Sequence, residues 1–312
     1  NSFKLSEENP LTGIGLSNWR MMYPKYGIGG AYHLNAGVMH FEHPHNEFLL
    51  LLSETGILSL LTFSALIVYI LLVARKNFKD PENGKILYLM FSGIVCILIL
   101  SFFGYPLHRP FTVSLLILMF GIILSLNKDV KVVNLTRLPV LIVLVLSLIN
   151  FRVLIARESG AAHMSKALHE QSKGRFPNML KELRMIDTEY YSIDNTGTPV
   201  NWYKGFAHHY SGMDSSLYYF ELAEHQNPFH IQVLSDIGAS FENNGEHGKA
   251  IEYFLRVLKI TPGFDDARLN LAVAYFNSGK VEDALRNINL VRRNSDYKDK
   301  VLEAILKSNQ HK

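Results

Sequence analysis

Four long apolar runs, almost free of charged residues, occupy the first half of the chain. They span residues 47–73, 86–103, 111–126 and 138–156 and consist mainly of Leu, Ile, Val and Phe. A bilayer core about 30 Å thick takes roughly 20 apolar residues as a helix, so each run approaches the length of one span, the third being short. Residues 157–312 hold most of the charge. We therefore predict an all-α chain, in which polytopic membrane helices (residues 47–156) precede a soluble helical-repeat domain (residues 157–312).

The basic residues of the connecting loops predict which side of the membrane each segment faces. Two loops are rich in them: the loop after the first run has Arg75, Lys76, Lys79 and Lys85, and the loop after the third has Lys128, Lys131 and Arg137. The loop after the second run has only Arg109. Short loops rich in Lys and Arg stay in the cytoplasm, whereas long domains cross largely regardless of charge. We expect residues 1–46, the loop 104–110 and the domain 157–312 to lie together on the outer side.

Charge and cysteine content argue against several other classes of protein. The formal net charge is only +3, and no basic stripe interleaved with aromatic residues is present, which disfavours nucleic-acid binding. Cys96 is the single cysteine and lies in the second run, so an internal disulfide and a thiolate metal cluster are excluded, and we expect Cys96 to pack against its neighbours. No signal-peptide pattern precedes Pro10, and the first residue is Asn1, so we expect the chain to be the C-terminal part of a longer protein.

The second half of the chain repeats itself with a period of 34 residues. The residues that pair at this offset are Pro228 and Pro262, Ile237 and Leu271, Gly238 and Ala272, Phe241 and Tyr275, Gly245 and Gly279, Ala250 and Ala284, Phe254 and Ile288, and Val257 and Val291. Small residues that allow close helix approach, turn glycines and an apolar seam predict helix–turn–helix units. The pattern resembles the tetratricopeptide repeat and is clearest over 230–262 and 264–296.

Further helices are needed around these two repeats, because one helical pair cannot bury its own apolar face. A degenerate copy is predicted before them, since Tyr203, Phe220 and Ala223 lie one period ahead of equivalent apolar residues. Helices within 158–190 and 297–309 should close the two ends of the stack. The usual role of such a stack is to bind a peptide or a partner domain, so the repeats by themselves indicate no chemistry.

The start of the first apolar run holds the sequence His43-Pro44-His45-Asn46-Glu47. Gly56 follows His45 by eleven residues, which returns to nearly the same face of a helix three turns later. If 45–73 is one helix, His45 lies at the membrane boundary with Leu52 and Gly56 beneath it, and Glu54 lies on the opposite face. Gly56 would then allow a neighbouring helix to approach closely.

These residues resemble a motif of the bacterial O-antigen ligase superfamily, which includes protein O-oligosaccharyltransferases and O-antigen polymerases. The motif is His, then Asn, Ser or Gln, then nine residues, Gly, two residues, and Gly, Thr or Tyr. This sequence matches it at His45, Asn46 and Gly56 and departs from it at Ser59. Two flanking elements also look like the family: Asn9-Pro10-Leu11-Thr12-Gly13-Ile14-Gly15 with Trp19, and Gly104-Tyr105-Pro106-Leu107.

The resemblance implies a metal-independent glycosyltransferase without a cofactor. Such an enzyme moves a glycan from a polyprenyl (undecaprenyl) diphosphate carrier to an acceptor hydroxyl of lipid A core, a protein Ser or Thr, or a growing polysaccharide. The location implied is the periplasmic face of the bacterial inner membrane. His45 would be the catalytic base, because an imidazole titrates near neutral pH. Asn46, Tyr105, Arg20 and Arg109 are the candidate substrate-binding residues, and Gly13, Gly15, Gly56 and Ser59 are the structural motif residues.

Other interpretations of the same residues remain open. His45 could be a helix-capping or interfacial histidine, and Arg109 could reach for the membrane interface. His40, His43 and His45 with Glu42 and Glu47 could hold a metal, although they lack the His-Glu-x-x-His arrangement. Glu54 could be functional or could lie in the headgroup layer. For the chain as a whole, the alternative is a membrane-anchored scaffold whose repeats recruit envelope proteins, and a transporter is less favoured.

Overall fold

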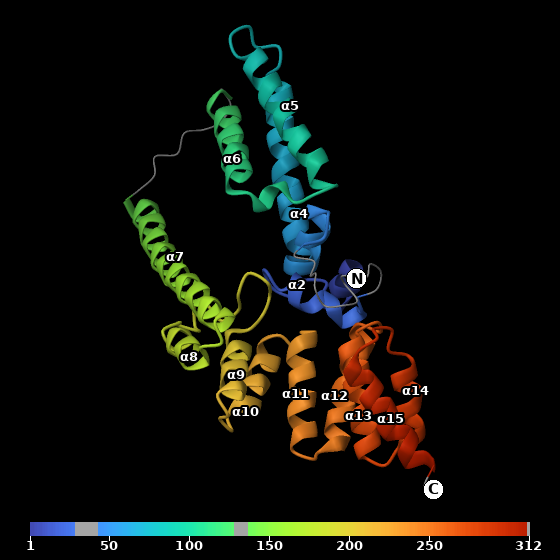
Figure 1. Cartoon of the computed structure of the whole chain (residues 1–312). Helices are drawn as coiled ribbons and strands as arrows, with labels where there is room; N and C mark the ends of the chain where they lie inside the picture. Colours follow the sequence, from blue (N-terminus) through green and yellow to red (C-terminus); the bar gives the residue numbers. More distant parts are fainter. Residues whose placement is uncertain (29–42, 128–136, 311–312) are drawn as a thin grey trace. The chain divides into compact units, whose positions relative to one another are not determined.

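The structure, a computed structural model, describes residues 1–28, 43–127 and 137–310 (Figure 1). Within these ranges the chain forms α-helices and short 3-10 helices, and the β structure is limited to one isolated bridge between Ile193 and Pro199. The all-α prediction is confirmed for these residues. The chain divides into two compact units, the first made of residues 1–23 and 41–141 and the second of residues 24–40 and 142–312.

Unit 1 is built around three apolar helices. Its elements are α1 (Ser2–Glu8), α2 (Trp19–Met22), α4 (Glu47–Lys76), α5 (Gly84–Ser101), the 3-10 helix η2 (Pro106–His108) and α6 (Pro110–Ser125), while η1 (Tyr23–Tyr26) begins at its boundary. Helices α4, α5 and α6 bury a shared core that includes Ile70, Leu87, Ile94 and Ile123. Many large apolar side chains on these helices remain exposed, as in helices that face lipid.

Three helices of the described chain are long and apolar enough to cross a membrane: α4, α5 and α7 (Arg137–Ser172). Helix α6 covers the third apolar run but has 16 residues. At 1.5 Å per residue it is about 24 Å long, shorter than a bilayer core of about 30 Å. The four predicted spans are therefore three helices of sufficient length and one short apolar helix.

Local sequence signals fix both ends of α4. Asn46 caps its first turn, because the side-chain Oδ1 accepts a hydrogen bond from the backbone N–H of Leu49 at 2.9 Å. Arg75 and Lys76 lie in the last turn, where positive charge complements the helix dipole. Asn77 follows the helix, and its amide donates to Asn127 Oδ1 at 3.3 Å, which links the ends of α4 and α6.

Helix α4 is interrupted at Gly56, which corrects the expectation that 45–73 is one regular helix. Gly56 has φ 78° and ψ 178°, backbone angles that are essentially restricted to glycine. The helix also begins at Glu47, so His45 lies outside it. The stripe predicted from His45 through Leu52 to Gly56 therefore does not form, because regular helical periodicity covers neither end of it.

The loop 9–15 repairs the hydrogen bonding that the break disrupts. Ile14 donates its N–H to the carbonyl oxygen of Ser53, Gly15 donates to that of Glu54, and Ile57 donates to that of Pro10, all at 2.8–2.9 Å. Three backbone groups of α4 beside the break, the carbonyl oxygens of Ser53 and Glu54 and the N–H of Ile57, thus gain a partner from the loop. What approaches Gly56 is therefore this loop and not a neighbouring helix.

Two glycines make this docking possible. A Cβ atom on Gly56 would lie 2.2 Å from the carbonyl oxygen of Leu11, and one on Gly13 would lie 2.3 Å from the carbonyl carbon of Glu54. Gly13 and Gly15 both have positive φ angles, so they make turns as expected. Gly56 of α4 thus lies against the backbone of the loop, and Gly13 of the loop lies against the backbone of α4.

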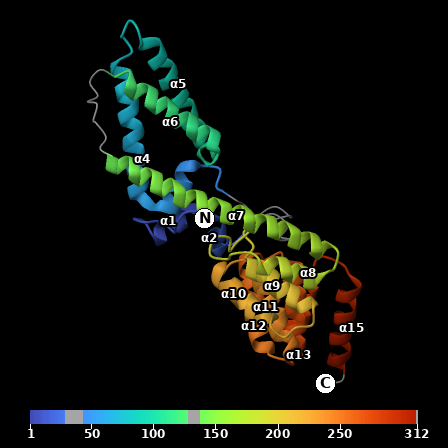
Figure 2. The same cartoon turned by 90° about the vertical axis from the view of Figure 1, so that its left-hand side faces the viewer.

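Helix α7 continues without a break from the fourth apolar run into the repeat domain (Figure 2). Its 36 residues span about 54 Å. Most residues of its apolar part are exposed, whereas Gly160, Met164 and Ala167 are buried, the last two in a core shared with α8 and α9. The boundary predicted at residues 156 and 157 thus falls inside one helix.

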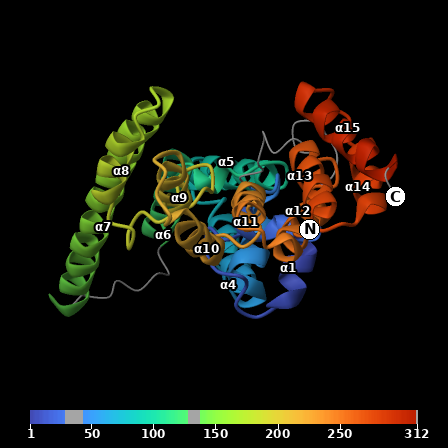
Figure 3. The same ribbon diagram turned by 60° about the horizontal axis from the view of Figure 1, so that its bottom comes forward.

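The rest of unit 2 is a stack of helical pairs (Figure 3). Its helices are α8 (Phe176–Arg184), α9 (Val200–Tyr210), α10 (Ser216–Gln226), α11 (Ile231–Asn243), α12 (His247–Ile260), α13 (Asp265–Asn277), α14 (Val281–Asn289) and α15 (Asp296–Gln310). Gly245 and Gly279 take positive φ angles between paired helices. The expected degenerate copy forms the pair of α9 and α10, and Ile305 of α15 joins the last core cluster.

Some sequence expectations differ from the structure or lie outside the described residues. Cys96 was expected to pack but is exposed on α5, because it lies on a face that α4 and α6 do not cover. The predictions for Lys128 and Lys131, and for the possible metal ligands His40 and Glu42, fall outside the described ranges.

Candidate functional site

The residues around His45 lie where three segments of unit 1 meet: the start of α4, the end of α5 and η2. Asn46 uses both ends of its amide to hold this junction, because its Oδ1 caps α4 and its Nδ2 donates to the carbonyl oxygen of Phe102 at 3.2 Å. The rings of Phe48 and Phe102 pack with centroids 4.6 Å apart. Asn46 therefore has a structural role here, and its predicted contact with substrate stays a prediction.

His45 is exposed at this junction and lies beside Tyr105, with ring centroids 6.1 Å apart. Tyr105 also contacts His43, whose ring centroid is 5.3 Å away. His43 in turn lies 4.6 Å from the ring of His108. The structure thus gathers His45 and Tyr105, both predicted site residues, with His43 and His108 into one aromatic cluster, in which His45 and His108 are exposed.

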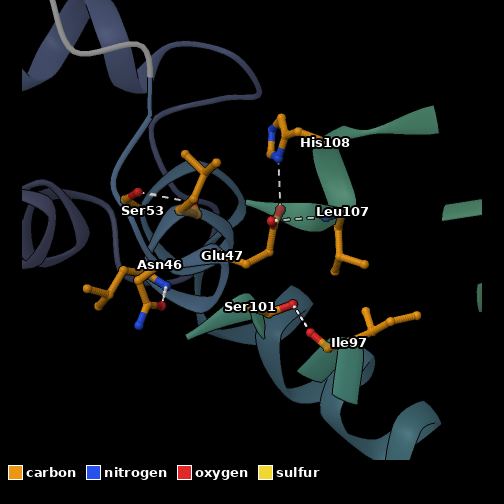
Figure 4. Close-up of polar contacts among 9 residues, drawn as sticks. Asn46, Glu47, Ser53, Ile97, Ser101, Leu107 and His108 are labelled. Carbon is orange, nitrogen blue, oxygen red and sulfur yellow. Dashed lines mark hydrogen bonds and ion pairs between the residues drawn. The ribbon is translucent and has the colours of Figure 1, made fainter. Parts of the chain in front are cut away.

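Glu47 fixes His108 within this cluster, as Figure 4 shows. Glu47 is 7% exposed; its Oε1 lies 2.8 Å from Nδ1 of His108, and its Oε2 accepts the backbone N–H of Leu107 at 3.3 Å. A carboxylate at this distance selects the imidazole form that carries a proton on Nδ1. The hydrogen bond to Glu47 raises the pKa of His108, so the imidazolium is favoured at this position.

The two candidate arginines occupy different parts of unit 1. Arg109 is exposed immediately before α6 and directly follows His108, so it adds a permanent positive charge next to a histidine that favours its charged form. Arg20 lies on α2 and is half-buried. Only Arg109 is adjacent in sequence to the cluster around His45.

The motif residue Ser59 and the candidate Glu54 both make hydrogen bonds close to the break in α4. Ser59 donates its hydroxyl to the carbonyl oxygen of Thr55 at 3.1 Å. Glu54 is buried and accepts the backbone N–H of Trp19 at 3.0 Å, so it holds α2 against α4 and does not contact His45. Trp19 also donates its indole N–H to Ser2 and stacks on Tyr23. The segment before residue 24 is thereby anchored to the motif helix.

No group of three or more potential metal ligands occurs among the residues that the structure describes. His40 and Glu42 belong to the metal interpretation but lie outside these residues, so that interpretation is not tested. Within the described part, the Glu47 carboxylate is engaged with His108 and Leu107.

Sequence reasoning missed the pairing of Glu47 with His108. From the sequence, Glu47 was considered only as a possible metal ligand, and His108 was not singled out. A carboxylate directly after the cap of an apolar helix was the available signal, because its burial requires a nearby donor. The partner itself could not be read from the pattern, since 61 residues separate the two side chains.

Comparison with known proteins bears on the repeat domain. Residues 243–294 match the family model of the tetratricopeptide repeat, so the chain contains this repeat over α12, α13 and α14. No curated protein matches the chain. Solved structures of MamA resemble it over about half its length. One is 18% identical, covers 49% of this chain and 76% of that chain, and has a TM-score of 0.37. Two others are 17% identical, with TM-scores of 0.40 and 0.41, each covering 52% of this chain and 90% and 84% of their own.

Proposed function

We propose that the chain is part of an integral membrane glycosyltransferase that moves a glycan from a polyprenyl diphosphate carrier to an acceptor hydroxyl. The observation that carries the proposal is the cluster of His45, Tyr105 and the Glu47–His108 pair at one end of the apolar helices. It is supported by the motif resemblance at His45, Asn46 and Gly56. We further propose that this end faces the periplasm and that the helices lie in a bacterial inner membrane.

The proposed reaction is a single displacement that needs a base and a site for a departing anion. The acceptor oxygen forms a bond to the anomeric carbon while the bond from that carbon to the diphosphate oxygen breaks. The polyprenyl diphosphate leaves with the bonding electron pair, and the acceptor proton passes to His45. His45 is exposed and makes no side-chain hydrogen bond to the described residues, so both ring nitrogens are open to a substrate.

The positive charge near His45 suits the second requirement. His108 is biased toward its imidazolium form by Glu47, and Arg109 follows it at the start of α6. Cations placed where negative charge develops stabilise a departing diphosphate, and a guanidinium matches phosphate oxygens in a bidentate manner. In this proposal His108 and Arg109 contact the diphosphate, and Glu47 positions His108.

The test is replacement of His45 by alanine in the full-length protein in its own membrane. We expect a ligated glycan, glycoprotein or polymer to disappear from envelope gels while the amount of the protein in the membrane is unchanged. His225→Ala is the matched control, because His225 is exposed on α10 of the repeat unit, and it should leave every product intact. The product that disappears identifies the acceptor. Unchanged glycans in the His45 variant would refute the proposal.

One observation favours a second candidate function, a membrane-anchored scaffold. The tetratricopeptide repeat match indicates protein–protein interaction by the second unit. A scaffold would keep its envelope partners after the His45 substitution and lose them when residues 228–296 are deleted. The two functions are compatible, since a partner bound to the repeats could be the acceptor of the enzyme.

A further inference from the structure

A groove runs between α9 and α11 on the repeat unit. Its deeper part is a cavity of about 190 Å³ whose walls include Phe206 and Tyr210 of α9, Phe220 of α10, and Asp236 of α11. A second hollow of about 450 Å³ continues it along the turn after α9. The two share the residues His209, Ser240 and Asn243, so they form one continuous surface within unit 2.

A row of aromatic rings lies on successive turns of α9, and its members Phe206 and Tyr210 line one wall of the groove. The Trp202 ring lies 5.4 Å from Phe206, and the Phe206 ring lies 4.6 Å from Tyr210. Tyr210 is 57% exposed although it is a large aromatic side chain. One face of the Tyr210 ring stacks on Phe176, with centroids 5.0 Å apart, and the exposed part of the ring remains available to a ligand. Cations bind aromatic faces at about 6 Å or less.

The floor of the groove carries a carboxylate whose described hydrogen-bond donors are neutral. Oδ2 of Asp236 accepts the indole N–H of Trp202 at 2.7 Å, and Oδ1 accepts the amide of Gln232 at 3.3 Å. Burial raises the pKa of Asp236 to about 6, yet the group is mostly ionised at pH 7.5. A half-buried negative charge without a cationic partner is costly, and a ligand that brings a positive charge removes that cost.

The rest of the groove also carries a carboxylate and lacks lysine and arginine side chains. Asp214 lines the second hollow, and neither Lys nor Arg lines either part. His209 lines both parts, and its ring packs against Tyr210. Anionic ligands are therefore disfavoured, whereas an ammonium or guanidinium group meets a carboxylate on one side and aromatic rings on the other.

We propose that this groove binds a Lys or Arg side chain of a partner protein, with Asp236 as its counter-ion and Phe206 and Tyr210 as its aromatic wall. The proposal names the chemical group that the repeats would recognise on a partner protein, and it does not depend on glycosyl transfer. A basic, extended segment fits best, because the second hollow with Asp214 gives space for a neighbouring residue of the same segment.

The experiment uses the full chain in detergent micelles at pH 7.5 with the peptide acetyl-Gly-Lys-Gly-Lys-Gly-amide. The chain has two tryptophans, so a Trp19→Phe background leaves Trp202, which is bonded to Asp236, as the reporter of binding. We expect the peptide to shift Trp202 emission saturably, and we expect the same peptide with acetylated lysines to bind at least about tenfold more weakly.

Three variants test the assigned residues. Asp236→Asn keeps the size and an acceptor for Trp202 but removes the charge, and we expect it to lose at least about tenfold in affinity. Tyr210→Leu should lose several-fold, and since Tyr210 is largely exposed this change leaves the fold intact. Glu221→Gln is the matched control, because Glu221 is an exposed carboxylate on α10 outside the groove, and it should bind as the parent does.

Three results would overturn the proposal. The first is equal binding of the acetylated and unmodified peptides, and the second is equal binding of the lysine peptide by the Asp236 and Glu221 variants. The third is a saturable Trp202 response to a neutral oligosaccharide such as chitotriose with no response to the lysine peptide, which would assign the groove to a glycan. Retention of glycan product by the Asp236 variant, with loss in the His45 variant, separates this proposal from the enzymatic one.

Discussion

The carboxyl group of Asp236 makes the stability of the repeat unit depend on pH. Burial raises its pKa from an ordinary value of 3.8 to about 6 in the folded chain. Between these values the folded chain keeps a proton that the unfolded chain has released, so the free energy of unfolding falls as pH rises. The two pKa values differ by about 2.2, which corresponds to roughly 3 kcal/mol. The folded chain has this extra stability well below pH 3.8 and has lost it well above pH 6.

The effect is measurable between pH 4.5 and 7.5, where the linkage amounts to about 2 kcal/mol. The perturbation is Asp236→Asn, which cannot titrate. Subtracting its unfolding free energy from that of the parent chain removes the contributions of all other titrating groups. We expect the variant to gain about 2 kcal/mol over the parent on going from pH 4.5 to pH 7.5.

Urea unfolding of the full chain in detergent, followed by Trp202 emission in the Trp19→Phe background, gives both free energies. The indole of Trp202 donates to Asp236, so its emission reports the structure around this carboxyl group. Glu221→Gln should show no such pH-dependent gain, because Glu221 is exposed. A parent-minus-variant difference that is constant within about 0.5 kcal/mol across this range would refute the linkage argument.

Three further predictions concern other parts of the chain. Gly56→Ala should destabilise unit 1 by at least about 3 kcal/mol and speed proteolysis of the loop 9–15, because the new Cβ would lie 2.2 Å from a backbone carbonyl and the φ angle of this residue is 78°. Gly121→Ala is the control, because a Cβ on Gly121 meets open space. Equal protease resistance of the two variants would contradict the prediction. Glu47→Gln should lower the pKa of His108, so that its imidazole loses its proton at a lower pH in an NMR titration of labelled histidines; an unchanged titration would show that Glu47 does not set this pKa. Leu234→Ala should lower the unfolding free energy of the repeat unit by about 2–5 kcal/mol in urea melts, because Leu234 is almost fully buried; a loss under about 1 kcal/mol would mean that the site collapses around the smaller residue.

Much of the architecture follows from local pattern. The apolar runs predicted the positions of α4, α5, α6 and the first half of α7, because burial in lipid or core needs unbroken apolar surface along a helix. The 34-residue period predicted the helical pairs α11–α12 and α13–α14, since each repeat must present the same seam to its neighbour. The start of α4 was placed at residue 45, whereas the helix begins at Glu47 after the cap Asn46, a residue type that is typical of helix starts.

The break at Gly56 was missed for a physical reason. A glycine inside an apolar helical pattern is compatible with a regular turn, and the pattern does not show whether another segment will supply replacement hydrogen bonds. Only the docked loop supplies them, through Pro10, Ile14 and Gly15. The two motif elements that the resemblance treats separately are thus one structural unit.

The candidate sites also combine features that the sequence indicates with contacts that only the tertiary structure shows. The sequence indicated that His45 lies at the end of an apolar helix. It did not single out Trp202 and Asp236, although the two residues are one repeat period of 34 residues apart. It could not indicate that these two side chains bond to each other, or that Glu47 holds His108 from 61 residues away. Local propensity and periodicity depend on neighbours within one or two turns, so the sequence by itself determined the helices, the repeats and the position of the histidine motif. Contacts between distant segments depend on how the helices pack, and this is why only the tertiary structure decided the helix break, the Glu47–His108 pair and the acidic aromatic groove.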